Sequence, residues 1–66
     1  MTPDKVRELL AEIDMNRGDP EWAHGDEDEL HQAVLHAIAC GNCENPQECA
    51  RLALESKQIE FDRWYA

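Results

Sequence analysis

The chain has 66 residues, which is enough for one small domain and too few for most enzymes. Fifteen Asp and Glu against six Lys and Arg give a formal net charge of −9, which argues against direct binding to the phosphate backbone of nucleic acids. Leu, Ile, Val and Phe together make up only twelve residues, a proportion that at this charge is typical of disordered chains unless the apolar residues are regularly spaced.

A first helix is predicted over residues 3–15. Thr2 is a favourable N-cap, and Pro3 suits the first helical position because its missing N–H would have no partner there. Apolar residues recur at the i, i+3, i+4 and i+7 spacing of one helix face: Val6, Leu9, Leu10 and Ile13. Gly18 is expected to end this segment in the left-handed conformation.

Residues 19–25 are predicted to form a connecting loop, because they hold a proline and a glycine within seven positions. Trp22 is the apolar anchor of this loop. A tryptophan in a polar loop usually folds back over the core, although tryptophan is also enriched among the residues that dominate protein interfaces. We expect Trp22 to cover the core, and exposure as a partner-binding residue is the alternative.

A second helix is predicted over residues 26–40, with Asp26 as N-cap and Glu29 three positions later in a capping-box-like start. Its apolar stripe consists of Leu30, Ala33, Val34, Ala37 and Ile38. Leu35 lies off this stripe, so the helix is apolar over more than half of its circumference, as expected of a central helix. Gly41 is expected to cap its C-terminus.

A third helix is predicted over residues 46–57, because Asn45 is a good N-cap, Pro46 suits the first turn, and Glu48 can reach back to the cap. Its apolar side consists of Cys49, Ala50, Leu52, Ala53 and Leu54. The aromatic tail that follows alternates apolar and polar residues, and we expect it to strap Phe61 and Trp64 across the helices.

Caps, breakers and apolar stripes therefore agree on one domain over residues 1–66, an all-α compact three-helix bundle with an aromatic C-terminal tail. A chain of this length often gains additional stability from a metal, a disulfide or self-association, because apolar burial barely exceeds conformational entropy at this size. A homodimer that covers Leu35 is one such route.

No segment approaches the ~20 consecutive apolar residues of a membrane span, and residues 1–5 lack the basic and apolar regions of a signal peptide. Cys40, Cys43 and Cys49 are an odd number of cysteines close together, which favours thiols in a reducing compartment over a secreted disulfide framework. We therefore expect a cytoplasmic protein without membrane contact.

The negative charge is concentrated in the middle of the chain. Between Arg17 and Arg51 there is no Lys or Arg, whereas eight carboxylates occur: Asp19, Glu21, Asp26, Glu27, Asp28, Glu29, Glu44 and Glu48. Such acids can simply favour helix N-termini and keep a small protein soluble. Alternatively, they form a surface for a basic partner, which includes mimicry of DNA by rows of carboxylates.

Four side chains of the types that zinc takes follow an H-x3-C-x2-C-x5-C spacing: His36, Cys40, Cys43 and Cys49. A structural zinc ion would supply stability that the small core lacks. The alternatives are reduced structural thiols, since free cysteine is among the most buried residue types, and a redox-labile Cys40 and Cys43 pair.

No catalytic constellation emerges from the sequence. Asp26, Asp28 and the histidines near them do not converge at helical spacing on one metal ion, and the chain has no phosphate-binding glycine loop. Glu27 and His31 are four residues apart, so they are expected to form an ordinary helix-surface pair that raises the histidine pKa. We therefore expect a protein without enzymatic activity and without a bound cofactor.

The chain resembles small acidic helical proteins of unknown function from actinobacteria and their phages. The residues that prompt this comparison are Val6-Arg7-Glu8-Leu9, Ala23-His24-Gly25, Glu27-Asp28-Glu29-Leu30-His31, Val34-Leu35-His36-Ala37-Ile38-Ala39 and the ending over residues 59–66. The resemblance implies a phage or prophage context, in which small acidic proteins often modulate host machinery. It implies no catalytic residue.

The sequence thus favours a non-enzymatic interaction module that binds a host or self protein with a basic surface. The alternatives are a DNA-mimicking inhibitor of a nucleic-acid-binding protein and a zinc-stabilised minidomain. The expected partner-binding residues are Asp19, Glu21, Trp22, Asp26, Glu27, Asp28, Glu29, Trp64 and Tyr65.

Overall fold

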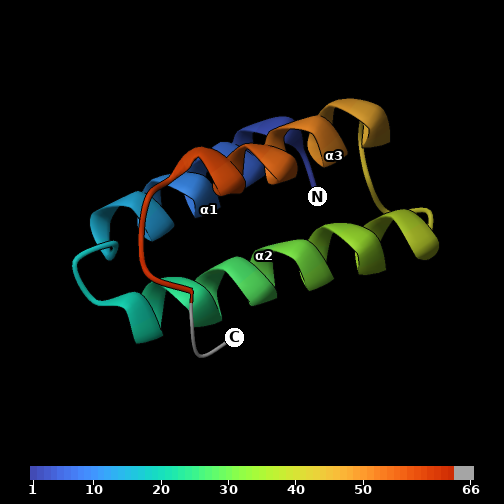
Figure 1. Ribbon diagram of the computed structural model, residues 1–66. Helices are drawn as coiled ribbons and strands as arrows, with labels where there is room; N and C mark the ends of the chain where they lie inside the picture. Colours follow the sequence, from blue (N-terminus) through green and yellow to red (C-terminus); the bar gives the residue numbers. More distant parts are fainter. Residues whose placement is uncertain (64–66) are drawn as a thin grey trace.

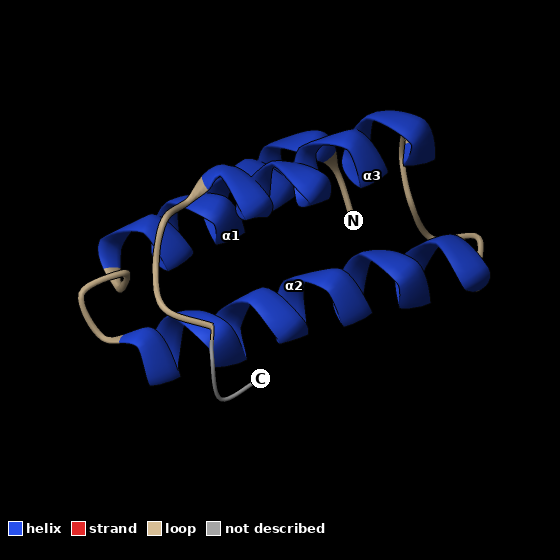
Figure 2. Ribbon diagram, in the orientation of Figure 1, coloured by secondary structure: helices blue, strands red, loops and turns tan. Residues whose placement is uncertain are grey.

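The computed structural model describes residues 1–63 and contains three α-helices, α1 (Pro3–Met15), α2 (Pro20–Ala39) and α3 (Pro46–Leu54). A single turn of 3₁₀ helix, η1 (Glu55–Gln58), continues directly from α3. In Figure 1, α1 and α3 lie together on one side of the molecule and α2 lies opposite both. Figure 2 shows that helices and loops account for all of the described residues, which confirms the all-α three-helix prediction.

Helix α1 has the predicted bounds and the predicted inner face. Thr2 Oγ1 accepts the Lys5 N–H at 3.1 Å, and Pro3 occupies the first helical position. Val6 and Ile13 are fully buried, and the two leucines between them are partly buried against the core. The end differs from the prediction, because Gly18 does not adopt the left-handed conformation and Asn16 caps the helix.

Helix α2 begins at Pro20, six residues earlier than predicted, so the predicted loop over residues 19–25 and the predicted cap at Asp26 are wrong. Asp19 is the N-cap, with its Oδ1 accepting the Trp22 N–H at 3.4 Å. Pro20 is tolerated because it stands at the first helical position, where its missing N–H leaves no hydrogen bond unmade. Gly25 lies inside the helix, where it costs only about 1 kcal/mol relative to alanine.

The predicted glycine cap of α2 is confirmed. Gly41 has a φ of +74°, and its N–H donates to Ile38 O at 3.1 Å while the Asn42 N–H donates to Ala37 O at 2.8 Å. These two bonds form a Schellman motif, which satisfies carbonyl groups that would otherwise lack partners at the helix end. The connection then meets the start of the chain, where the Glu44 N–H donates to Met1 O at 2.9 Å.

The start of α3 has the predicted position but not the predicted cap. Asn45 lies in the left-handed region at φ 51° and makes no side-chain capping bond, and Glu48 binds Arg51 instead of reaching back. Pro46 disfavours the right-handed helical region for the residue before it, and asparagine tolerates the left-handed one. The predicted span to residue 57 is divided, because the α-helix ends at Leu54 and η1 continues to Gln58.

The core lies between the three helices and consists of Val6, Ile13, Ala23, Leu30, Val34, Cys49, Leu52 and Ala53. After η1 the chain crosses from the α1 and α3 side to α2 (Figure 1), and Ile59 and Phe61 pack against this core. The strap predicted for Phe61 is thereby confirmed, whereas Trp64 lies outside the described residues. No helix within residues 1–63 is both long and apolar enough to cross a membrane.

Candidate protein-interaction surface

Trp22 lies in the first turn of α2 and points away from the core. Trp22 is 65% exposed, so the prediction that it covers the core is wrong. The cause is the early start of the helix, because a register that buries Ala23 turns the preceding residue outward. Trp22 is therefore the most prominent exposed aromatic side chain among the residues that the structure describes.

Trp22 borders a shallow depression of about 370 Å³. We call its lining the Trp22 surface, which consists of Asp19, Glu21, Trp22, Gly25, Asp26 and Glu29. Four of these residues, from Trp22 to Glu29, follow the i, i+3, i+4, i+7 spacing of one helix face. Gly25 leaves the centre of that face open, since a Cβ atom built there meets no atom within 4 Å.

The Trp22 surface carries four carboxylates, from Asp19, Glu21, Asp26 and Glu29. Within residues 1–63, no Lys or Arg side chain forms an ion pair with any of them, and Asp26 instead accepts a hydrogen bond from Asn16 Nδ2 at 3.3 Å. Arginines neutralise acids elsewhere, as where Arg17 pairs with Asp14 at 3.4 Å. The surface therefore carries a one-signed negative potential beside an apolar ring.

Glu27 was expected on this surface, but it is buried, with only 3% of its residue exposed. It belongs to the inner stripe of α2 with Ala23, Leu30 and Val34. Burial of a lone carboxylate would be strongly unfavourable, so Glu27 requires partners that neutralise and hydrogen-bond it. Its position on the partner-binding surface is thus a wrong prediction.

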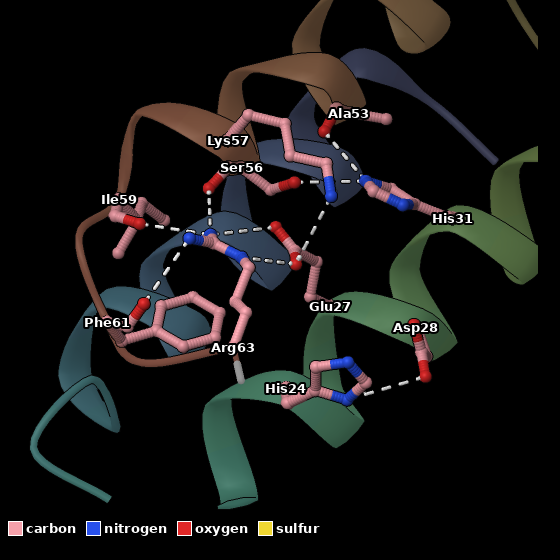
Figure 3. Close-up of polar contacts among 10 residues, drawn as sticks. All are labelled: His24, Glu27, Asp28, His31, Ala53, Ser56, Lys57, Ile59, Phe61 and Arg63. Atoms are coloured by element: carbon pink, nitrogen blue, oxygen red, sulfur yellow. Dashed lines mark hydrogen bonds and ion pairs between the residues drawn. The ribbon is translucent and has the colours of Figure 1, made fainter. Parts of the chain in front are cut away.

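Arg63 supplies the main partner of Glu27 (Figure 3). Its Nε donates to Glu27 Oε1 at 2.9 Å and its Nη2 donates to Oε2 at 3.1 Å, a bidentate geometry that suits a carboxylate. The same Nη2 also donates to the carbonyl oxygens of Ser56 and Ile59, at 3.1 and 3.0 Å. The guanidinium lies over the Phe61 ring, 3.8 Å from its centroid. Arg63 thereby fastens the C-terminal segment to α2.

His31 joins the other side of this network, as Figure 3 shows, and does not pair with Glu27 as predicted. Its Nε2 lies 3.2 Å from Ala53 O and 2.9 Å from Ser56 Oγ. Because a carbonyl oxygen only accepts, Nε2 carries the proton and donates to both. The hydroxyl proton of the buried Ser56 is then available for its hydrogen bond to Glu27.

The network keeps Glu27 ionised. Burial by itself raises the pKa of this carboxyl, but hydrogen bonds from Arg63 and Ser56 and the charges of Arg63 and Lys57 outweigh burial and lower the pKa from 4.5 to about 2. Lys57 contributes from a more exposed position, with its Nζ 3.7 Å from Glu27 Oε1. The hydrogen bond to Glu27 likewise raises the pKa of Arg63.

The remaining predicted partner-binding residues lie apart from the Trp22 surface. Asp28 is exposed but pairs with His24, whose Nδ1 lies 3.5 Å from Asp28 Oδ2 (Figure 3). Trp64 and Tyr65 lie outside the described residues. The part of the predicted set that the structure brings together is therefore Asp19, Glu21, Trp22, Asp26 and Glu29.

The four zinc-type side chains form two pairs and not one site. Cys40 Sγ lies 4.0 Å from His36 Nε2 at the end of α2, whereas Cys43 and Cys49 both contact Glu44 O. Within residues 1–63, no three His, Cys, Asp or Glu side chains are placed to hold one metal ion. The arrangement thus does not assemble the zinc site proposed from the spacing.

A second, apolar depression lies between α2 and α3 and is lined by His31, Val34, Leu35, Ala50, Ala53 and Leu54. Leu35 and Leu54 are 67% and 66% exposed. The exposure of Leu35 follows from its position off the inner stripe of α2, as the sequence indicates. The exposure of Leu54 differs from its predicted place on the apolar side of α3.

No protein-family model, curated protein or solved structure matches this chain. The pairing of Glu27 with Arg63 was not predicted from the sequence. A signal for the burial of Glu27 was present, because Glu27 shares the helical spacing of Leu30 and Val34 within the predicted helix.

Proposed function

We propose that this chain is a non-enzymatic protein-interaction module that binds a basic partner through the Trp22 surface. The observation that carries the proposal is the exposed indole of Trp22 beside four carboxylates that, within residues 1–63, have no Lys or Arg partner. Tryptophan is among the residues most enriched at the energetic centres of protein interfaces. A tryptophan that is 65% exposed is the kind of anchor such interfaces use.

The chemistry of the surface favours a partner segment that carries Arg or Lys. A guanidinium or ammonium group over the indole face gains a cation–π interaction, and the surrounding carboxylates accept its hydrogen bonds. The net charge of −9 adds long-range attraction that accelerates encounter with a basic surface. The resemblance to small acidic proteins of actinobacteria and their phages favours a host protein as the source of such a segment.

The test is a titration of the ¹⁵N-labelled protein with a short Arg- and Lys-containing peptide, followed by NMR at low and high salt. We expect shifts at Trp22, Gly25 and Glu29, and a large loss of affinity in the Trp22→Ala variant. The matched control is Leu35→Ala, because Leu35 is exposed to the same extent on the same helix. Shifts spread evenly over all acidic residues would contradict the proposal.

The salt series distinguishes two modes of binding. Affinity that survives high salt and fails in Trp22→Ala indicates an apolar anchor, whereas affinity that vanishes with salt and ignores Trp22→Ala indicates recognition of carboxylates alone. The second result would favour the alternative proposal, a DNA-mimicking inhibitor. The contribution of the surface charge is tested by comparing the affinity of Glu29→Gln with that of Glu60→Gln, which removes one exposed carboxylate outside the Trp22 surface.

A second copy of this chain is the second candidate partner, for a different face. The depression around Leu35 and Leu54 contains no carboxylate in its lining, so two negatively charged chains would meet there with the least repulsion. Light scattering over a range of concentrations tests this candidate. A dimer that Leu35→Ala weakens and Trp22→Ala does not would support it, and a monomer throughout would remove it.

A further inference from the structure

Two thiols meet at the connection between α2 and α3. Cys49 Sγ donates to Glu44 O at 3.3 Å, and Cys43 Sγ donates to the same oxygen at 3.7 Å. The Glu44 carbonyl oxygen thus accepts both thiol protons, so the two sulfur atoms lie next to the same backbone atom.

The fold fixes both thiols in place. Cys49 belongs to the second turn of α3 and is fully buried in the core. Cys43 follows the Schellman motif of α2, and the backbone next to it is held by the bond from the Glu44 N–H to Met1 O, at 2.9 Å. Asn45, in the left-handed region, then turns the chain back into α3. The backbone between α2 and α3 therefore holds Cys43 next to Cys49.

The three cysteines differ in access to solvent. Cys40 is exposed and lies beside His36, Cys43 is half-buried, and Cys49 is buried. Burial raises the pKa of the Cys49 thiol, and the neighbouring Cys43 and Glu48 raise it further against the opposing charge of the chain's amino group. Cys43 is therefore the member of the pair that an external reagent reaches first.

We propose that Cys43 and Cys49 form a dithiol modification site that is oxidised to an intramolecular disulfide by a low-molecular-weight disulfide such as oxidised glutathione. The Cys43 thiolate attacks one sulfur of the reagent, so that a mixed disulfide forms and one glutathione thiolate leaves. The Cys49 sulfur then attacks the Cys43 sulfur and displaces the second glutathione. The two cysteines are oxidised, the reagent is reduced to two thiols, and the two protons pass to the leaving thiolates.

This assignment replaces the pair that spacing alone suggested. The sequence offers Cys40 and Cys43 as the nearest two cysteines, but Cys40 contacts His36 on α2 while Cys43 contacts the same carbonyl as Cys49. A disulfide between Cys43 and Cys49 would tie the connection to the core helix α3. Cys43 and Cys49 lie in a different part of the molecule from the Trp22 surface, so this proposal can be tested independently of the proposed function.

The experiment uses the Cys40→Ser variant, which removes the exposed thiol, and treats the folded protein with oxidised glutathione. We expect loss of both remaining thiols, a mass about 2 Da below that of the reduced protein with no retained glutathione, and a linked peptide that contains Cys43 and Cys49. The matched control is Cys40→Ser/Cys43→Ser, in which the buried Cys49 should remain reduced under the same conditions.

Retention of one or two glutathione adducts in Cys40→Ser, without a linked peptide, would overturn the proposal. So would a Cys40 to Cys43 link as the main product in the unsubstituted chain. Circular dichroism of the two variants confirms that they remain helical, which is expected because neither Cys40 nor Cys43 is a fully buried residue.

Discussion

The two faces of the first half of α2 use the same residue types for opposite purposes. On the inner face, Glu27 is buried and held by Arg63, Ser56 and Lys57. On the outer face, Asp26 and Glu29 border an exposed tryptophan and have no Lys or Arg partner among the described residues. Of these neighbouring acids, Glu27 thus stabilises the fold, whereas Asp26 and Glu29 are available to bind a partner.

This difference shows that the sign and number of charges in a segment do not define a surface. One residue of rotation, about 100° around a helix, separates a carboxylate that locks the fold from one that faces solvent. The energetic meaning also differs, because a buried pair is costly to break while an exposed carboxylate contributes little to stability.

Removing the inner carboxylate should have the largest effect. Breaking a fully buried ion pair costs about 3–5 kcal/mol, and we expect Glu27→Ala to lose about 2–3 kcal/mol of unfolding free energy. We expect less than the cost for a fully buried pair because the Arg63 side chain is 26% exposed. Urea denaturation measures this loss, with Glu29→Ala as the control on the outer face. Equal effects of the two substitutions would refute the contrast.

Acid should weaken the inner face specifically. The pKa of Glu27 is lowered from 4.5 to about 2 in the folded chain, so its stabilisation is complete above the unfolded pKa and is lost as the pH falls toward the folded one. We expect a loss of about 2 kcal/mol between about pH 5 and about pH 2 beyond that seen in Glu27→Gln. Parallel pH profiles of the two proteins would show that Glu27 is not the titrating group.

Ser56→Ala should have an intermediate effect. It removes an acceptor from His31 and a hydrogen bond to Glu27, at a cost of about 1 kcal/mol. Because that hydrogen bond lowers the pKa of Glu27, the substitution should also shift the Glu27 titration upward. Carbon-detected NMR of the Glu27 carboxyl measures its pKa in the folded variant and in the folded unsubstituted protein. An unchanged titration would place the Ser56 hydroxyl outside the network.

Trp22→Ala should have the smallest effect on stability. Removal of this exposed side chain does not disturb the core, so we expect the free energy of unfolding to change by no more than about 0.5 kcal/mol, as at other exposed positions. Thermal unfolding of the variant beside the unsubstituted protein checks this value. A large loss would mean that Trp22 supports the fold, and the outer face would then lose its main argument as a binding surface.

The sequence by itself determined much of the architecture. Helix α1, the Gly41 cap and the start of α3 at Pro46 follow from local signals, because caps, proline and glycine act through the backbone of the few residues around them. The acidic middle of the chain is likewise a property of composition. These features can therefore be predicted from residues that are close in the sequence.

Tertiary structure decided the roles of individual side chains. The start of α2 at Pro20 still follows local signals, with Asp19 as N-cap and Pro20 at the first helical position. Packing of this helix against the others then buries Ala23 and Glu27 and leaves Trp22 exposed. Arg63 meets Glu27 across 36 positions of sequence, and Cys43 meets Cys49 only because the connection folds back on α3. Such encounters depend on how the helices pack, and pairing over that separation leaves no periodic trace in the sequence.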